Sequence, residues 1–362
     1  LMVSSIRQMP AGKITTYSRH DPFPGAEDGI DVKVEVEIRP DDAMIEVDLR
    51  DNPDCYPCGL NLSQACTESS VLLGVFNSIQ EDVPTNAGSL RRVKMHLREN
   101  CVVGIPRHPT SCSVATTNVA DRVGNSVQRA IAELGDGHGM ASAGSIIPPS
   151  IGVISGTSEK TGGPYVNQIF LGWGGGGAGP QVDAWITIGH IGNAGGSYQD
   201  SIELDEMRFP MYVAGRHFIT DSGGVGRTRG GEAVYCEFGP TEGDMEIGYV
   251  SDGNDHAPEG TRGGGGGARA NQYRRDLNGD LHQLEACAQV VIPEGHTIVS
   301  YSCGGGGYGP PIDRPAEKVA HDVRERWVSV EAAKEIFGVV VSSAGVIDET
   351  ATEALRVAQG AS

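Results

Sequence analysis

Glycine makes up 52 of the 362 residues, and its uninterrupted runs at positions 174–177, 263–267 and 304–307 constrain the fold more than any other feature. Glycine loses more backbone entropy on folding than any other residue, so a fold that keeps this many needs positive φ angles or very close backbone approach there. The runs lie between apolar or aromatic segments, whereas a flexible spacer mixes glycine with serine and charged residues. We therefore expect built structure at these runs, with disordered linkers as the alternative.

The charge balance limits the partners of the chain. It carries 47 acidic and 28 basic residues, a formal net charge of −19. A surface that binds nucleic acid or an anionic membrane needs an excess of Lys and Arg, so both classes of partner are disfavoured. No stretch approaches eighteen apolar residues, and residues 1–7 lack a signal-peptide core. We expect a soluble, cytoplasmic protein with one large or two ordinary domains.

Eight cysteines are spread along the chain without the dense, regular spacing of a small secreted scaffold. Reduced thiols are therefore expected. Cys55 and Cys58 form a C-x-x-C pair, but no second ligand pair at a matching spacing accompanies it. This favours buried or idle thiols over a metal or redox site.

The secondary-structure signals change along the chain. Residues 31–50 alternate apolar and polar side chains on both sides of a Pro-Asp-Asp turn, which predicts a β-hairpin. Residues 118–134 place apolar side chains at helical spacing, which predicts a helix with one solvated face and Asn118 as its N-cap. Between 150 and 300, short β-rich runs alternate with Gly, Asp, Asn and Pro. Helices are predicted again at 315–323, 329–338 and 348–358.

Together these patterns predict an α+β fold with a sheet-rich core, glycine-rich turns, flanking helices and a short helical C-terminal segment. We expect an α+β domain at 1–150, a β-rich glycine-loop domain at 151–311 and a helical segment at 312–362. No repeat of fixed period appears, because the glycine runs have different flanks.

Several motifs occur in the order in which one known family carries them. They are DVPTNAG at 82–88, DSGGVGRTRGG at 221–231, GGGGYGPP at 304–311, VAHDV at 319–323 and WVSVEAAKEIFGVV at 327–340. Because they run through nearly the whole chain, the chain resembles the hydantoinase B / 5-oxoprolinase family.

The resemblance implies that the chain is one component of a larger enzyme. Family members usually carry about 200 further residues ahead of the point where this chain begins, roughly one additional domain. In relatives that part holds a divalent metal (Zn, Mn or Fe) bound by Asp and His. The resemblance therefore implies the C-terminal part of a split or processed large subunit. A further chain would supply the metal-binding part, and a hydantoinase A-like partner would bind ATP with Mg.

The same resemblance implies the reaction. ATP phosphorylates a carbonyl or lactam oxygen, and the activated species is then hydrolysed or, in acetone and acetophenone carboxylases, attacks CO2 derived from carboxyphosphate. The chain has no G-x-x-x-x-G-K-[ST] loop, which favours ATP on the partner. Hydrolysis of a ring amide is the lead prediction, carboxylation of a ketone is the alternative, and a non-catalytic assembly subunit is a third possibility.

His190 is the candidate catalytic residue. It matches the histidine of a His-x-x-Asn segment in the family, which makes Asn193 a candidate substrate contact, although Gly192 and Ala194 replace the family's threonines. A histidine at this place can bond a substrate carbonyl or move a proton. The alternative is a core histidine with satisfied hydrogen bonds.

Arg227 and Arg229 are candidate substrate-binding residues. Two cations two positions apart point to one side of an extended segment and can grip an anion. A structural salt bridge to Asp221 is the alternative, and it is favoured.

Two further features have a functional and a structural interpretation. The glycine runs can form a phosphate-binding nest of backbone N–H groups, but tight turns are favoured because no helix start with Lys and Ser or Thr follows. Glu203, Asp205 and Glu206 can form an acid–base group, but a solvated acidic face is favoured.

Overall fold

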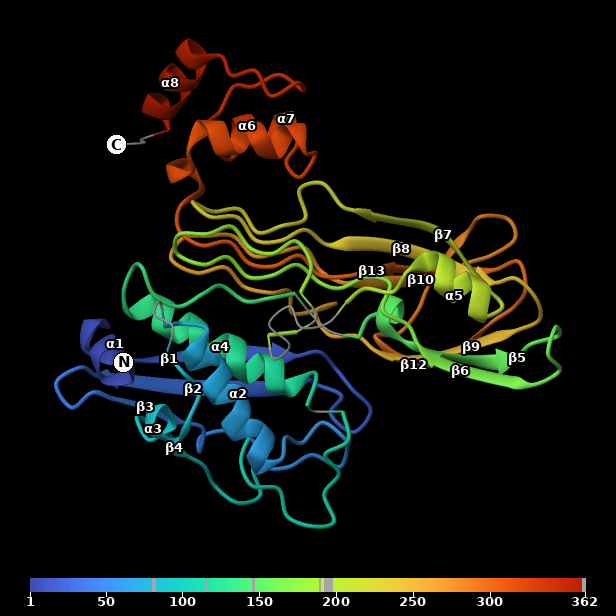
Figure 1. The fold of residues 1–362 in the computed structure, drawn as a ribbon, viewed down its shortest axis with the longest axis horizontal. Coiled ribbons are helices and arrows are strands. Elements are labelled where there is room, and N and C mark those ends of the chain that lie inside the picture. The colour runs from blue at the N-terminus through green and yellow to red at the C-terminus, as the bar shows by residue number, and fades with distance from the viewer. Residues whose placement is uncertain (80–82, 115, 145–146, 189, 192–197, 360–362) are drawn as a thin grey trace.

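The computed structural model describes residues 1–79, 83–114, 116–144, 147–188, 190–191 and 198–359. Within them the chain forms three β-sheets with helices around them, which confirms the predicted α+β class. Figure 1 shows a sheet with helices from the first part of the chain, two further sheets beside it, and the C-terminal helices at one end. The domain limits at 150 and 311 stay a prediction.

The first part is a four-stranded sheet in the order β1-β2-β3-β4, in which β3 and β4 pair in parallel and the other pairs are antiparallel. The predicted hairpin is present: Ile38 pairs with Ile45, and Ala43 at the turn has a left-handed φ of 51°. One face of β2 buries Val32, Val34 and Val36, as the alternation requires. Its elements are α1 (Met2–Gln8), β1 (Gly12–His20), β2 (Ile30–Arg39), β3 (Met44–Asp48), α2 (Gln64–Phe76), α3 (Ala87–Leu90), β4 (Val93–His96) and α4 (Val119–Leu134).

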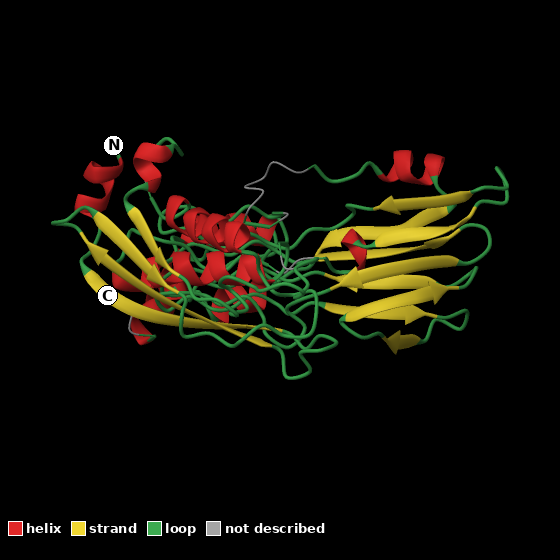
Figure 2. Ribbon diagram, turned by 90° about the horizontal axis from the view of Figure 1, so that it is seen from below, coloured by secondary structure: helices red, strands yellow, loops and turns green. Residues whose placement is uncertain are grey.

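The middle part is a β-sandwich. A five-stranded sheet, β11-β10-β13-β8-β7, faces a four-stranded sheet, β12-β9-β5-β6 (Figure 2). Side chains such as Phe238, Ile247 and Ile298 are fully buried in the core that joins them. The elements are β5 (Val153–Thr157), β6 (Pro164–Gln168), α5 (Ile202–Arg208), β7 (Met211–Phe218), β8 (Val234–Pro240), β9 (Met245–Val250), β10 (Asn271–Arg275), β11 (Leu281–Gln283), β12 (Cys287–Ile292) and β13 (Thr297–Tyr301), with a 3-10 turn at Pro149–Ile151.

The glycine runs form a bundle of extended backbone beside the sandwich, seen as parallel ribbons at the centre of Figure 1. We call residues 141–144, 174–178, 222–231, 258–268 and 302–309 the glycine bundle. Gly305 lies inside it: its N–H donates to the Gly231 carbonyl at 2.9 Å, and its own carbonyl accepts from Gly224 N–H at 2.7 Å. The runs are built structure, as expected.

Close approach is the reason for glycine in these runs. A Cβ atom on Gly305 would stand 1.7 Å from the Gly176 oxygen, and one on Gly175 would stand 2.0 Å from the Gly231 oxygen. Within the three runs, only Gly263 has a left-handed φ, of 91°. The bundle amides of Gly175, Gly305 and similar residues donate to backbone carbonyls, so they are not arranged as a phosphate nest. Without side chains, the backbone of one segment can be hydrogen-bonded and closely packed by neighbouring segments on several sides, which explains why the runs need glycine.

The C-terminal part consists of α6 (Ala316–Arg324), α7 (Val330–Glu335) and α8 (Glu349–Ala358), with a 3-10 turn at Pro311–Asp313. Ser329 caps α7, as predicted, by accepting from Ala332 N–H at 3.0 Å. Gly338, predicted to end this helix, has a left-handed φ of 63°. Phe337, Val319 and neighbouring side chains form a small core of their own.

A buried arginine fastens the C-terminal part to the bundle. Arg314 is 1% exposed. Its guanidinium donates to Asp322 at 2.9 Å and to both oxygens of Asp183, at 2.6 and 3.0 Å. Asp322 belongs to α6, whereas Asp183 lies in the segment after the first glycine run. The arginine thus joins segments far apart in the sequence.

Arg314→Met should release this attachment. The substitution keeps an apolar stem but removes the nearest cation of both carboxylates, leaving Asp322 with Arg229 at 3.6 Å and Asp183 with Lys318 at 3.9 Å. Breaking a buried ion pair costs ~3–5 kcal/mol. We expect a loss of that size in urea denaturation and faster proteolysis after residue 311. Arg324→Met, on the exposed side of α6, is the matched control and should change stability by less than ~0.5 kcal/mol. Equal stability of the two variants would contradict this role of Arg314.

Candidate functional site

The candidate site lies along one face of α4. Asp121, Gly124, Asn125 and Gln128 follow one another at helical spacing, and all are buried, Gln128 to 1% exposure. The sequence predicts a solvated face for this helix. That prediction is wrong, because residues 141–143 of the glycine bundle and the segment at 190–191 cover the polar face. A buried polar face needs partners or a ligand, so it marks a site.

His190 meets this face through Asp121. Its Nδ1 lies 3.2 Å from Asp121 Oδ1, and Asp121 Oδ2 accepts from Ile191 N–H at 3.3 Å. Burial raises the pKa of Asp121, while His190 and the Ile191 amide act in the opposite direction. The contact depends on Gly124: a Cβ there would stand 2.1 Å from Ile191 Cδ1, so glycine lets the histidine segment lie against the helix. A carboxylate on one ring nitrogen orients the imidazole.

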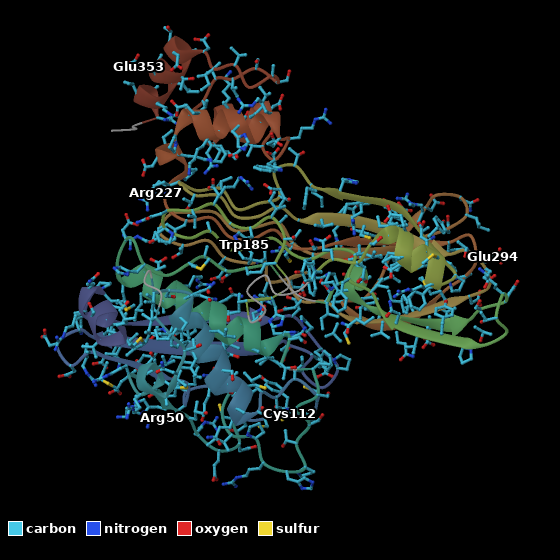
Figure 3. All side chains as sticks on the ribbon, in the orientation of Figure 1. Arg50, Cys112, Trp185, Arg227, Glu294 and Glu353 are labelled. Carbon is cyan, nitrogen blue, oxygen red and sulfur yellow. The ribbon has the colours of Figure 1, made fainter. Side chains whose placement is uncertain are left out.

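A cavity of about 320 Å³ is lined by Ile188 and Ile191, on either side of His190 in the sequence, but not by His190 or Asp121 themselves. Trp185, labelled in Figure 3, lines it together with residues on either side of the histidine segment. Most of its wall is apolar, and among the described residues no Lys, Arg or His side chain lines it. The lining includes Met140, Ala143, Val182, Trp185, Ile188 and Ile191, with Asn77, Gln128 and Asp183 as its polar side chains. Such a wall suits a largely apolar ligand that carries no negative charge.

The start of α4 is anchored by buried charges. Arg122 donates to both oxygens of Asp252 at 2.7 Å. Burial raises the pKa of Asp252, but Arg122 and then His20 outweigh it and lower that pKa to about 2. Asn118 stands at the N-cap position, as predicted, but its side chain does not cap the helix; its Nδ2 contacts His20 Nε2 and the Val250 carbonyl, both at 3.2 Å. The amide therefore ties α4 to the sandwich.

Arg227 and Arg229 do not converge on one point. Arg227, labelled in Figure 3, donates to both oxygens of Asp136, at 3.1 and 2.7 Å, and lowers the pKa of Asp136 to about 2. Arg229 is buried, pairs with Glu232, and lies 4.8 Å above the Trp327 ring. Neither pairs with Asp221, which instead accepts from Ser329 N–H at 2.8 Å. Neither lines the cavity beside His190, and their role in substrate binding stays a prediction.

Asn193, the other predicted contact, lies outside the described residues. Asp121, Asn125 and Gln128 were not predicted as site residues, since a polar helical face usually indicates solvent. The only signal in the sequence is that this face carries amides and small residues where an exposed helix usually carries charged ones.

The acidic cluster divides into two kinds of carboxylate. Glu203 and Glu206 are exposed on α5, as the favoured interpretation requires, but Asp205 is only 6% exposed. Burial, together with the nearby Asp200, raises the pKa of Asp205 to about 6. Because α5 lies over the sandwich (Figure 1) and none of its residues lines the cavity, this carboxyl affects stability more directly than the site.

Asp205→Asn should stabilise the protein near neutral pH. The folded-state pKa lies above the ordinary value of 3.8, so stability falls as the pH rises from about 4 to about 6, and the whole penalty is present above that. Allowing for solvent screening, we expect a gain of ~1 kcal/mol at pH 7.5 and none at pH 3.5 in urea denaturation. Met207→Gln, at an exposed position of the same helix, removes no titrating group and should give no such pH-dependent difference. A gain that is the same at both pH values would refute the raised pKa.

Among the described residues, no group of three His, Cys, Asp or Glu side chains is placed to hold a metal ion. Cys55 and Cys58 form no disulfide, and burial raises the pKa of both thiols above the ordinary value. Within the described part of the chain, no helix is both long and apolar enough to cross a bilayer.

The sequence and the fold of this chain match known proteins. A family model described as Hydantoinase B/oxoprolinase matches residues 1–311. The chain therefore belongs to the hydantoinase B/oxoprolinase family, which confirms the resemblance seen in its motifs.

Two curated relatives show where the chain falls within the family. The chain is 27% identical over 334 residues to the beta subunit of the caprolactamase of Pseudomonas jessenii, covering 91% of this chain and 57% of that one. It is 24% identical over 369 residues to the B component of a putative D-/L-hydantoinase of Pseudomonas sp. (strain NS671), covering 98% and 60%. The chain thus spans less than two thirds of each relative.

Two solved structures share the fold. The ATP-dependent caprolactamase of Pseudomonas jessenii matches with a TM-score of 0.81 and 24% identity over 98% of this chain and 62% of the other. The nucleotide-free structure of an acetone carboxylase matches with a TM-score of 0.81 and 18% identity over 99% and 54%. At these identities the likeness shows a common fold.

Proposed function

We propose that this chain is a subunit of an ATP-dependent, hetero-oligomeric enzyme that activates a lactam oxygen by phosphorylation and hydrolyses the ring amide. Family membership and the names of the caprolactamase and hydantoinase relatives support this reaction class. The observations that carry it to this chain are the His190–Asp121 pair and a largely apolar cavity that the neighbouring Ile191 lines; neither His190 nor Asp121 lines that cavity. Such a cavity suits a neutral ring.

The proposed reaction proceeds in steps that assign a role to His190 and Asp121. A lactam oxygen is a poor leaving group, so transfer of the γ-phosphoryl group of ATP to it produces an imidate phosphate and ADP, a species that water can attack at carbon. The tetrahedral adduct collapses with cleavage of the ring C–N bond and leaves an acyl phosphate, which a second water hydrolyses to the carboxylate and phosphate. His190 would take the proton from water and return it to the ring nitrogen. Because Asp121 holds Nδ1, Nε2 is the ring nitrogen that would carry the proton.

The remaining components are proposed to lie outside the described part of this chain. ATP with Mg would be held by a hydantoinase A-like partner, since no phosphate-gripping loop motif occurs in the sequence. A divalent ion (Zn, Mn or Fe) would be held by a partner or by the family's N-terminal part, because the described residues offer no three convergent ligands. When bound, such an ion would polarise the substrate oxygen. A cytoplasmic location is also proposed.

Reconstitution tests this proposal. The chain would be purified alone and with its co-expressed partners, and ring opening of a neutral lactam and of hydantoin would be followed with and without ATP. We expect no turnover by the chain alone and ATP-dependent ring opening by the complex. Turnover by the isolated chain would contradict it. ATP hydrolysis that needs a ketone and bicarbonate, without ring opening, would establish the carboxylase alternative, and a complex insensitive to substitution of His190 would indicate an assembly subunit.

A further inference from the structure

A second hollow, of about 550 Å³, lies between α6 and residues 183–187. We call it the α6 groove. Asp183, Ala184 and Trp185 line both this groove and the apolar cavity described above, so the two hollows share one stretch of chain as a wall. The α6 groove differs from the cavity because lysine, arginine and histidine side chains line it. The proposed reaction assigns no role to it.

The α6 groove holds one cation more than its own carboxylates can pair with. Arg314 occupies both of these carboxylates, Asp183 at 2.6 and 3.0 Å and Asp322 at 2.9 Å. Arg229 is neutralised by a buried glutamate. Lys318 is left over: its Nζ lies 3.9 Å from Asp183, beyond hydrogen-bond distance, and its side chain is 47% exposed. In a chain with a net charge of −19, this ammonium group suits a carboxylate that comes from another molecule.

Trp185 adds a large apolar surface to the groove, since it is 61% exposed. The backbone beneath it is fixed: its carbonyl accepts from Gly176 N–H at 2.9 Å, and Ala184 N–H donates to the Arg229 carbonyl at 2.8 Å. Trp327 also lines the groove, with the Arg229 guanidinium 4.8 Å from its ring. Tryptophan and arginine on a rigid support are the residues that dominate binding at protein–protein interfaces.

These features favour a protein chain over a small molecule as the occupant of the groove. A small-molecule site encloses its ligand, whereas the indole of Trp185 is mostly exposed. An exposed tryptophan beside a surplus ammonium group calls for a partner that offers both an apolar side chain and a carboxylate. An acidic segment of another polypeptide offers both, and the caprolactamase relative is itself named as a subunit.

We propose that the α6 groove binds an acidic segment of the ATP-binding partner chain, with a carboxylate of that segment on Lys318 and its apolar side chains against Trp185. This inference rests on the proposed function, because it names the surface on which the partner of that function docks. Docking covers residues 183–185 from the groove, and the same residues form a wall of the apolar cavity. Assembly therefore fixes that wall.

The first test measures assembly without any turnover. Dilution of the co-expressed complex, followed by analytical ultracentrifugation, gives the dissociation constant of the partner. Lys318→Glu should weaken binding about 10- to 100-fold, because it places one carboxylate against another. Lys318→Met should weaken binding less and should reduce the dependence of the affinity on NaCl, since salt screens exposed charges. Lys334→Glu makes the same charge change on α7, outside the groove, and should assemble like the wild type.

The second test concerns Trp185. Trp185→Ala should weaken binding at least about 30-fold, the loss at an interface hot spot. The fold should survive because the indole is mostly exposed, and circular dichroism checks this. With p-benzoylphenylalanine in place of Trp185, irradiation of the complex should link this position to a partner peptide that contains Asp or Glu. Links only to a second copy of this chain, or only to a partner peptide without an acidic residue, would overturn the inference.

These outcomes separate the docking surface from the reaction. If Lys318→Glu prevents assembly but the wild-type complex opens no ring, the proposed reaction has failed and the docking surface stands. If the wild-type complex opens lactam rings while Lys318→Glu and Trp185→Ala assemble as tightly as the wild type, the inference has failed and the proposed function stands. Equal losses in Lys318→Glu and Lys334→Glu, or no complex between the wild-type chain and the ATP-binding partner, would also overturn the inference.

Discussion

Gly305→Ala is expected to destabilise the protein by at least ~4–5 kcal/mol, a large share of the roughly 5–15 kcal/mol that keeps a typical protein folded. The added methyl group would stand 1.7 Å from the Gly176 oxygen and 2.3 Å from its carbonyl carbon. These are backbone atoms in a close-packed bundle, which cannot turn aside as a flexible side chain can. Urea denaturation followed by circular dichroism measures the loss, and failure to obtain soluble protein is its extreme form.

Gly248→Ala is the matched control. Gly248 lies in the middle of β9, and a Cβ there meets nothing within 4 Å. Because glycine weakens a strand relative to alanine by about 0.5–1 kcal/mol, this variant should be as stable as the parent or slightly more so. Similar losses in both variants would show that close approach in the bundle is not what requires glycine.

His190→Ala should lower the kcat of the reconstituted complex by about 10²- to 10⁴-fold, the usual contribution of a positioned acid–base group. The fold should survive, because the residue is only partly buried and lies in a loop. Ring opening of a neutral lactam with ATP is the readout. Asp121→Asn, which changes the orienting partner, should lower kcat less and move the pH profile, whereas a merely structural contact would leave the profile in place.

His282→Ala provides the control for this pair. His282 lies in β11 and contacts Asp276 at 2.8 Å, so it is also a histidine held by an aspartate, but it belongs to the sandwich surface. Its removal should leave turnover unchanged. If both histidine variants keep full activity, His190 has no part in catalysis, and the chain has an assembly role.

Much of the fold could be predicted because the relevant signals are local. The alternation at 31–50 specifies the β2–β3 hairpin, and the serine at 329 specifies the start of α7, since both depend on residues a few positions apart. The family resemblance could likewise be recognised from short, contiguous motifs. These features do not depend on which distant segments meet.

The glycine bundle and the site depend on contacts between segments that are far apart in the sequence. Nothing near Gly305 in sequence shows that it will face Gly176, so the sequence indicates glycine-rich turns where the structure has packed, extended backbone. The polar face of α4 appears solvated until the segment with His190 covers it. Gln128 was missed for the same reason: its side chain is buried only once the whole chain has folded.

The most direct measurement is the location of a bound substrate in the assembled enzyme. A structure of the complex with δ-valerolactam and a non-hydrolysable ATP analogue should place the lactam ring in the cavity lined by Trp185 and Ile191, with its carbonyl on the side of His190. A lactam ring bound elsewhere, with this cavity filled only by water, would contradict the account.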